Sequence, residues 1–369
     1  MRPTAIVVMF GFSEGGEPWQ LVQQARLAAT LDLLERCISS QWDRVIFCSN
    51  RPELLSVNGL PLERVQAVTE PFHFGRELQL LIRRCRLEDF GVLYLGGGLP
   101  LLGPGTLEKV RTFVCSTEGG ALANNIHSCD FAGWGPGEAL LHAAAPDTDN
   151  DLAWQLRRIG LEAWELPRSA ETLFDVDTPA DLLLLSLSNE LGPRLRALLH
   201  AANLDSSRVR ATLEVLRDFE RTVLCYGRLS HHAWAYFAQH VACQTRIFSE
   251  ERGMRASGRL ARGEVRSLLG FAAEAMSWSG LFAALCELAH ALIIDTRVLM
   301  AHFRRWPRAE DRFYSDLLMP EHIGDPWLRE LTEAAAACPV PVLLGGHCLV
   351  SGGLYLLADA VGPKELPRS

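Results

Sequence analysis

The stretch GVLYLGGGLPLLGPGTL, residues 91–107, constrains the fold more than any other part of the chain. Residues 92–95 are a short apolar run bounded by turn formers, a pattern typical of a strand buried between two layers. Gly96, Gly97 and Gly98 then follow at the carboxyl end of this strand. Ligands bind at that edge in open α/β sheets, and glycines let the backbone approach a phosphate. The stretch therefore predicts a mostly parallel α/β sheet, whose glycines form either a ligand-binding turn or a plain connection to a helix beginning near Thr106.

A second motif, FDVDTPADL, lies at residues 174–182. Together the two stretches resemble the GT-A-type nucleotidyltransferase superfamily, which contains molybdenum-cofactor guanylyltransferase and phospholactate guanylyltransferase. In that family a strand ends in a Gly-Ala-Asp-Ser-Pro-Leu-type turn whose Asp holds a divalent metal, and the domain closes with Asp-x-Asp-Thr-Pro-x-Asp-Leu. Here the closing motif is intact, as Asp175, Asp177, Thr178, Pro179 and Asp181. In the first motif, Gly98 stands where the metal-binding Asp is expected.

The resemblance covers about the first 190 residues and implies a GT-A-like fold and a reaction. An acceptor phosphate or hydroxyl would attack a nucleoside triphosphate, pyrophosphate would leave, and Mg²⁺ would stabilise the charge. It also implies that Asp175 and Asp177 are the catalytic residues and the metal ligands. Two alternatives stay open: a catalytically degenerate nucleotide- or nucleotide-sugar-binding protein, or a glycosyltransferase. Asp177 and Thr178 equally suit a helix cap, because Pro179 fits the first helical position.

The loop GFSEGGEP, residues 11–18, follows a predicted first strand at residues 5–10. The resembled family has a glycine-rich loop here that wraps the triphosphate, although Glu14 and Glu17 carry the wrong charge for that role. The nearest cation is Arg26, in a helix expected over residues 19–37. The predicted nucleotide-binding residues are Gly11, Gly15, Gly16, Arg26, Gly96, Gly97 and Gly98.

The segment IHSCDFAGWGPG, residues 126–137, is expected to form a loop. Related enzymes bind the acceptor in this region, and an aromatic side chain flanked by glycines can shape such a pocket. The predicted acceptor-binding residues are Asp130, Gly133 and Trp134.

The second half of the chain predicts another α/β block, with strands at residues 222–226, 246–248, 288–294 and 340–344. Each strand ends in polar or glycine residues, which would meet at one edge if the strands are parallel. The predicted second site, for an anionic ligand, consists of Arg228, Glu250, Asp295, Arg297 and His347. The alternative is that these strand ends are polar because loops are exposed.

Length and composition set the remaining expectations. The 369 residues predict a nucleotidyltransferase-like domain over 1–190, a helical linker over 191–218 and an α/β domain over 219–369. A net charge of -8 argues against a nucleic-acid partner and leaves a nucleoside triphosphate and a small acceptor as the expected ligands. Ten cysteines without a CxxC pair indicate reduced thiols and a cytoplasmic location. We expect no membrane span, because no run approaches about 20 apolar residues. The sequence does not decide between a monomer and a homodimer.

Overall fold

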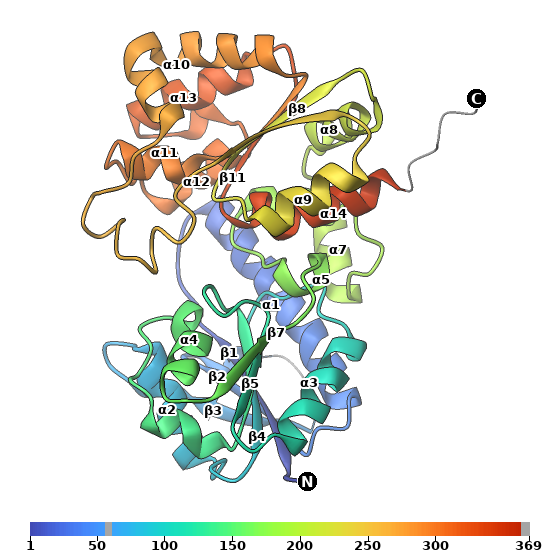
Figure 1. The fold of residues 1–369 in the computed structure, drawn as a ribbon, viewed down its shortest axis with the longest axis vertical. Helices are drawn as coiled ribbons and strands as arrows, with labels where there is room; N and C mark the ends of the chain where they lie inside the picture. The colour runs from blue at the N-terminus through green and yellow to red at the C-terminus, as the bar shows by residue number, and fades with distance from the viewer. Residues whose placement is uncertain (56–60, 363–369) are drawn as a thin grey trace. The chain divides into compact units, whose positions relative to one another are not determined.

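The computed structural model describes residues 1–55 and 61–362. The chain forms two compact units, and each of them is assembled from separate stretches of sequence (Figure 1). Unit 1 comprises residues 1–13, 25–173 and 192–196, and unit 2 comprises residues 14–24, 174–191 and the chain from 197 onward. The units therefore differ from the predicted division at residues 190 and 218, because residues 14–24 and 174–191 pack with the carboxyl-terminal half.

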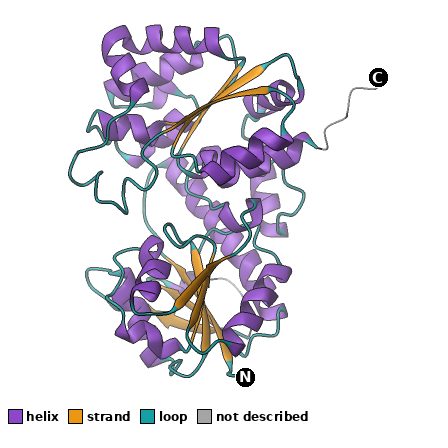
Figure 2. Ribbon diagram, in the orientation of Figure 1, coloured by secondary structure: helices purple, strands orange, loops and turns teal. Residues whose placement is uncertain are grey.

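Unit 1 is built on a seven-stranded sheet with the order β3-β2-β1-β4-β6-β5-β7. Figure 2 shows the strands of this sheet in orange with purple helices packed around them. The pairing is parallel except at β6, which runs antiparallel to both β4 and β5. The strands are β1 (Thr4–Phe10), β2 (Arg44–Ser49), β3 (Glu63–Gln66), β4 (Gly91–Gly96), β5 (Gly120–Ala123), β6 (Phe131–Gly135) and β7 (Glu162–Glu165).

Helices cover both faces of this sheet, and the alternation of side chains along β1 divides the core in two. Ala5, Val7 and Met9 pack with α2 and α4, whereas Ile6 and Val8 pack with α1 and α3. The helices of unit 1 are α1 (Glu17–Ser39, with residues 17–24 assigned to unit 2), α2 (Phe74–Arg84), α3 (Pro104–Ser116), α4 (Leu152–Arg158) and α5 (Ala170–Leu173). Single 3₁₀ turns are η1 (Pro52–Leu54), η2 (Gly137–His142) and η3 (Asp149–Asp151).

Unit 2 contains a four-stranded parallel sheet with the order β11-β10-β8-β9. The strands are β8 (Thr222–Gly227), β9 (Gln244–Ser249), β10 (Ala291–Asp295) and β11 (Val342–Gly345). The helices are α6 (Pro179–Leu185), α7 (Pro193–Ala202, with residues 193–196 assigned to unit 1), α8 (Ser207–Arg217), α9 (His231–His240), α10 (Leu268–Leu288), α11 (Thr296–His302), α12 (Ala309–Asp316), α13 (Pro326–Ala336) and α14 (Gly352–Val361). The 3₁₀ turns are η4 (Pro320–His322) and η5 (Cys348–Val350).

The connections of this second sheet create a switch point between β8 and β10. Helix α9 joins β8 to β9 on the face that also carries α8 and α14, while α10 joins β9 to β10 on the face that carries α13 (Figure 1). The strand order reverses between β8 and β10, and in open parallel sheets the carboxyl ends of the two strands at such a point frame a ligand crevice. The predicted fold class, α/β with a mostly parallel sheet followed by a second α/β unit, is confirmed.

Helix α10 differs from the expectation that no segment is apolar enough to cross a membrane. An 18-residue stretch within its 21 residues has a mean hydropathy of 1.4, so the helix is long and apolar enough by length and composition. Trp278, Leu281 and Leu285 pack into the core of unit 2, whereas Leu268 and Phe271 are exposed. The helix is thus partly a core element, and its composition alone decides nothing about a membrane.

The packing of α3 on β6 yields a first prediction. A Cβ added at Gly133 would lie 2.6 Å from Val110 Cγ1 and 2.8 Å from Val114 Cγ1. We expect Gly133→Ala to lower the free energy of unfolding by about 1–3 kcal/mol through overpacking. Gly105→Ala is the matched control, because nothing lies within 4 Å of its added Cβ, and a gain of up to about 1 kcal/mol is expected in the helix. Urea denaturation measures both, and equal effects would contradict the packing described.

Candidate functional site

The loop that follows β1 and the glycine turn that follows β4 lie side by side at the carboxyl edge of the unit 1 sheet. β1 and β4 are parallel neighbours, with Met9 opposite Gly96, and the Gly97 amide donates to the Met9 carbonyl at 3.0 Å. The Gly96 amide donates to the Asp130 carbonyl at 3.1 Å. Gly11 follows β1 at this same edge, is exposed and has open space around it. Gly11 and the glycine turn after β4 therefore lie at one edge of the sheet, but the Gly96 and Gly97 amides already donate to backbone carbonyls and cannot bind a phosphate.

The glycines of this turn are required for steric and conformational reasons. A Cβ on Gly97 would lie 2.5 Å from Phe10 Cδ2 and 3.0 Å from Thr30 Oγ1. Gly98 has a φ of 103°, a backbone conformation that other L-residues rarely adopt. An Asp at position 98 would therefore be strained, so the departure from the family's motif is built into the backbone of the turn.

Arg26 is the cation that the structure places at this turn. Its guanidinium carbon lies 5.8 Å from the centre of the Phe10 ring, and its Nη2 donates to the Gly97 carbonyl at 3.4 Å. The side chain is partly exposed. The start of the loop is fixed by Asn50, whose amide donates to the Phe12 carbonyl and whose oxygen accepts from the Phe12 amide, both at 2.8 Å.

Two acidic residues, Asp130 and Asp149, lie next to Gly96. Asp130 was predicted to bind the acceptor. Its Oδ2 atom accepts from Asn124 Nδ2 at 2.7 Å, which fixes the position of the side chain. Asp149 Oδ2 accepts from the Tyr94 hydroxyl at 3.3 Å and would lie 3.7 Å from a Cβ on Gly96. Burial, together with Asp149, raises the pKa of Tyr94 well above its usual value. The sequence analysis missed Asp149, because nothing in the segment DTDND marks which acid turns toward β4.

The other predicted acceptor residues do not lie in a loop. Gly133 and Trp134 belong to strand β6, and the Trp134 side chain is fully buried, with its indole nitrogen donating to the Gly137 carbonyl at 3.3 Å. A buried indole cannot stack on an acceptor, so this expectation is corrected. Glu171, the acid four residues before Asp175, accepts from the Gly103 amide at 3.0 Å at the start of α3.

The closing motif forms a helix cap in unit 2. The Asp181 Oδ2 atom accepts from the Thr178 amide, the Thr178 hydroxyl and the Asp177 amide at 2.6, 3.0 and 3.0 Å, and Pro179 opens α6. Asp181 is fully buried, and burial together with the charge of Asp177 raises its pKa to about 7. Asp177 itself is exposed, and Asp175 is partly exposed.

These residues do not fit the implied Mg²⁺ site. Among residues 1–55 and 61–362, no three His, Cys, Asp or Glu side chains form a group that could hold a metal ion. The hydrogen bonds of a helix cap account for the conformation of the closing motif. Capping is the alternative to metal binding that the sequence pattern leaves open.

Gly15 and Gly16 are assigned to unit 2, whereas Gly11 is assigned to unit 1. The Gly16 amide donates to Glu310 Oε1 at 3.3 Å, and the Trp19 ring stacks on the Phe313 ring with 5.5 Å between centroids. Gly16, predicted to help wrap a triphosphate, instead lies against α12, and its amide donates to a carboxylate there.

At the switch point of the unit 2 sheet, Arg228 and Asp295 form a buried ion pair. Arg228 Nε and Nη2 donate to the two Asp295 oxygens at 2.6 and 3.0 Å, and Asp295 is fully buried. Asp295 also caps α11 by accepting from the Arg297 amide. Burial, the largest single influence, opposes its ionisation, but the charge and hydrogen bonds of Arg228, together with the smaller effects of His347 and Arg297, lower the pKa of Asp295. Gly227, with a φ of 129°, lets the backbone approach this carboxylate, since an added Cβ would lie 2.4 Å from Asp295 Cβ.

The remaining residues of the predicted second site lie at the same edge with different partners. Arg297 donates to both Asp316 oxygens at 2.6 Å. His347 follows β11, and burial with the nearby Arg228 charge lowers its pKa to about 4, so it is neutral at pH 7. Glu250 accepts from the Leu268 amide at 2.8 Å at the start of α10. The predicted edge is therefore real, but both of its predicted arginines already have carboxylate partners.

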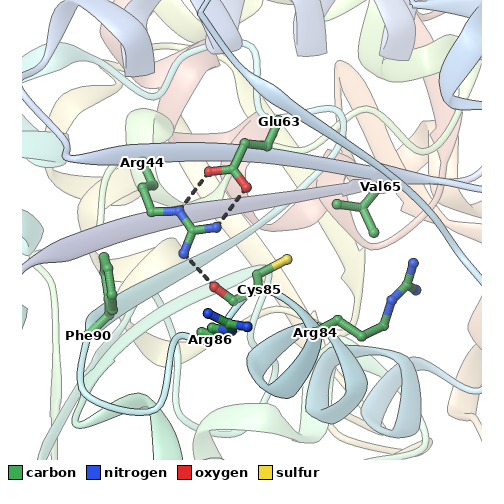
Figure 3. Close-up of a pocket in the computed structure, with 7 residues that line it drawn as sticks. All are labelled: Arg44, Glu63, Val65, Arg84, Cys85, Arg86 and Phe90. Atoms are coloured by element: carbon green, nitrogen blue, oxygen red, sulfur yellow. Dashed lines mark hydrogen bonds and ion pairs between the residues drawn. The ribbon is translucent and has the colours of Figure 1, made fainter.

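A pocket of about 560 Å³ opens at the opposite, amino edge of the unit 1 sheet (Figure 3). Its lining residues are Arg44, Glu63, Val65, Arg84, Cys85, Arg86 and Phe90. Arg44 and Glu63 begin β2 and β3 and form a two-point ion pair with nitrogen–oxygen distances of 2.6 and 2.7 Å. Figure 3 shows the Arg44 guanidinium held between Glu63 and the Cys85 carbonyl. This pocket contains none of the predicted site residues.

Comparisons with known proteins give only distant similarities. No family model and no curated protein matches the chain. Among solved structures, it is similar to a protein from Desulfovibrio desulfuricans G20 provisionally described as a nucleotide-diphospho-sugar transferase, at 13% identity over 56% of this chain and 100% of that chain, with a TM-score of 0.38. Rv0371c from Mycobacterium tuberculosis H37Rv is 20% identical over 50% of this chain and 99% of that chain, with a TM-score of 0.37, and a second Rv0371c structure is a manganese complex. The bifunctional IspDF from Campylobacter jejuni is 10% identical over 46% and 51% of the two chains, with a TM-score of 0.33. At these values, the function of this chain has to be argued from its own residues.

The buried pair at the switch point yields a second prediction. Asp295→Ala leaves the Arg228 charge without its partner, and we expect a loss of about 3–5 kcal/mol in the free energy of unfolding. The variant Asp205→Ala is the control, because Asp205 is an exposed acid elsewhere in unit 2. Guanidinium denaturation measures both, and a loss below about 1 kcal/mol for Asp295→Ala would contradict the role given to the pair.

Asp181 yields a third prediction, on pH dependence. Its folded-state pKa, raised to about 7, lies above the unfolded value near 4, so this group lowers stability as pH rises through that interval. Asp181→Asn keeps an acceptor oxygen and cannot ionise. We expect the stability of the variant relative to the parent to rise by about 1 kcal/mol or more between pH 5 and pH 8. Denaturation at both pH values checks this, and an equal difference at the two would show that Asp181 does not titrate as described.

Proposed function

We propose that unit 1 binds a nucleotide or a nucleotide sugar at the carboxyl edge of its sheet, as a nucleotidyltransferase-like protein that does not transfer the nucleotidyl group. The observation that carries the proposal is the position of Arg26. Its guanidinium lies over Phe10 and against the Gly97 carbonyl, beside the open backbone at Gly11. A phosphate bound at this edge would therefore meet a cation.

The chemistry of recognition follows from the groups at this edge. A guanidinium donates to phosphate oxygens through several N–H groups, and charge-assisted hydrogen bonds are roughly twice as strong as neutral ones. Gly97 and Gly98 leave the turn without side chains, and Asn50 holds the opening of the first loop in place. Asp130 and Asp149 lie at the same edge and suit hydroxyl groups, which carboxylates accept as hydrogen-bond donors.

Nucleotidyl transfer would need more than this edge supplies. In-line attack on a nucleoside triphosphate develops charge on the equatorial oxygens, which a metal ion and cations normally stabilise. The Gly98 turn disfavours the family's metal-binding Asp, and Asp181 of the closing motif is used in a helix cap. These features support ligand binding in preference to transfer.

Thermal-shift and calorimetric titrations of the full chain test this proposal. The probes are ATP, GTP, CTP, UTP and UDP-glucose, each with and without Mg²⁺ or Mn²⁺. We expect at least one probe to stabilise the protein without metal, and Arg26→Gln to weaken its affinity about ten-fold or more. Arg76→Gln is the matched control, because Arg76 is an exposed cation on α2 in the same unit.

Two results would overturn the proposal. One is an Arg26→Gln variant that binds every probe as well as Arg76→Gln does. The other is metal-dependent release of pyrophosphate from a triphosphate in the presence of a phosphorylated acceptor, which would show transfer.

A further inference from the structure

The loop that leads from β9 to α10, residues 250–267, carries arginines on its outer side (Figure 1). Met254 and Val265 are buried in the core of unit 2 and hold the loop in place. The arginines of this loop are Arg252, Arg255, Arg259, Arg262 and Arg266, and all of them except the partly exposed Arg259 are exposed. The two buried anchors therefore leave the cationic side chains on the surface of the unit.

Residues 304–308, which follow α11, add three exposed arginines beside this loop. Arg304 joins the two segments, because its Nε and Nη2 atoms donate to the Gly263 carbonyl at 3.2 and 2.9 Å. Together the two segments contain eight Arg and three Glu, an excess of five positive charges, whereas the whole chain has a net charge of -8. We call residues 250–267 and 304–308 the basic surface.

The acids of the basic surface are already engaged. Glu251 accepts from Arg259 at 2.7 and 2.9 Å, and Glu264 accepts from Arg262 at 2.9 Å on both oxygens. The third acid, Glu250, accepts from the first amide of α10 at 2.8 Å. These three carboxylates offset three of the eight charges, so the excess of positive charge stays at the surface.

The first part of α10 exposes an apolar stripe. The helix is interrupted at Ser277, whose φ of 68° is not helical, so its first part is residues 268–276. Leu268, Phe271 and Ala275 are exposed, the first two to 60% and 52%, and steps of three and four residues place all three on one helix face. The opposite face packs into the core of unit 2. A helix that is apolar on both faces is normally buried, so the exposed stripe marks an interaction surface.

Direct contacts join the apolar stripe to the basic surface. The Phe271 ring lies 4.8 Å from the His302 ring, and His302 is two residues before Arg304. His302 Nδ1 also accepts from the Ser267 amide at 3.0 Å. Glu274, whose Oε1 lies 3.3 Å from His302 Nε2, is an acid at the border of the stripe. The arginines and the exposed apolar side chains thus form one continuous surface of unit 2.

We propose that the basic surface and the apolar stripe bind the surface of an anionic lipid bilayer. This is a peripheral contact and not a membrane span. Arginines are attracted to anionic headgroups, while apolar side chains of a surface helix enter the boundary between headgroups and acyl chains. Leu268 and Phe271 are the exposed side chains that would enter this boundary.

Lipid fits this surface better than a nucleic acid or a polar protein surface does. Residues 267–286 include a single charged residue, Glu274. The stripe therefore offers few hydrogen-bonding groups to a polar partner, and a polynucleotide would leave its aliphatic side chains uncovered. A bilayer uses both properties of the surface, because it combines fixed negative charge with an apolar interior. The contact is separate from nucleotide binding in unit 1, since it uses no residue of that unit.

Co-sedimentation of the full chain with lipid vesicles tests the proposal. One set of vesicles is pure phosphatidylcholine, and the other contains about 30% phosphatidylserine. We expect binding to the anionic set that is at least about ten-fold tighter than to the neutral set and that weakens as salt is raised.

Two sets of variants separate the contributions of charge and of the stripe. Arg255→Gln with Arg305→Gln removes two exposed charges, and we expect binding to weaken about ten-fold or more, since each arginine near an anionic surface contributes about five-fold. Arg76→Gln with Arg210→Gln is the matched control, because both are exposed cations outside the basic surface; it should change binding less than about three-fold.

Phe271→Ser tests the apolar stripe, and we expect it to weaken binding about three-fold or more. Its matched control is Phe219→Ser, because Phe219 is 73% exposed and lies before β8, at the opposite edge of the sheet. This control should change binding less than about two-fold. Thermal unfolding shows whether each variant is folded, and the double arginine variant decides alone if Phe271→Ser is not.

Several results would overturn the proposal. They are an absence of binding to the anionic vesicles, equal binding to both sets of vesicles, and unchanged binding in both the double arginine variant and Phe271→Ser. Sedimentation equilibrium that shows a dimer disrupted by Phe271→Ser, without vesicle binding, would assign the stripe to a second copy of this chain. Binding of duplex DNA that is tighter than vesicle binding and insensitive to Phe271→Ser would assign the arginines to a nucleic acid.

Discussion

The Asp295 carboxylate joins the ends of two neighbouring strands and the start of a helix in unit 2. This one side chain ends β10, caps α11 and receives two donors from Arg228 at the end of β8, while no part of it is exposed. A buried ion of this kind is tolerated only when its oxygens are satisfied, so the carboxylate fixes the spacing of the two strand ends. Gly227 is required beside this carboxylate, because any larger residue would overlap the Asp295 side chain. A ligand at the carboxyl edge of this sheet could therefore contact only groups other than the Arg228 and Asp295 atoms that bind each other.

Much of the fold could be predicted from local sequence. The apolar runs at β1, β4 and β8 are short, rich in branched residues and bounded by turn formers, and each strand lies within two residues of its expected bounds. β6 was read as a loop because FAGWG has two glycines and no alternation, features that usually mark a turn. Its glycines serve instead to admit α3 against the sheet, which is a contact between distant segments.

The candidate sites were predictable to a smaller degree. Sequence patterns place polar residues at strand ends, but they do not say which charges pair: Arg297 finds Asp316, which comes from a helix and not from a strand end. The DVDTPAD segment shows the same limit, because an Asp three residues after a Thr suits both a capping box and a metal site. Only the positions of the amides around Asp181 distinguish the two.

The contact between residues 14–24 and α12 has a consequence for how this chain can be divided. Trp19 covers Phe313, and Gly16 engages Glu310, although about 290 residues separate the partners. Ala180 likewise lies against Gly345, the last residue of β11. A polypeptide beginning at residue 218 would lack both segments and would expose apolar side chains that the intact chain covers. Unit 2 is therefore not a module that could be excised, transplanted or acquired by joining sequences end to end; its boundaries exist in space and not along the chain.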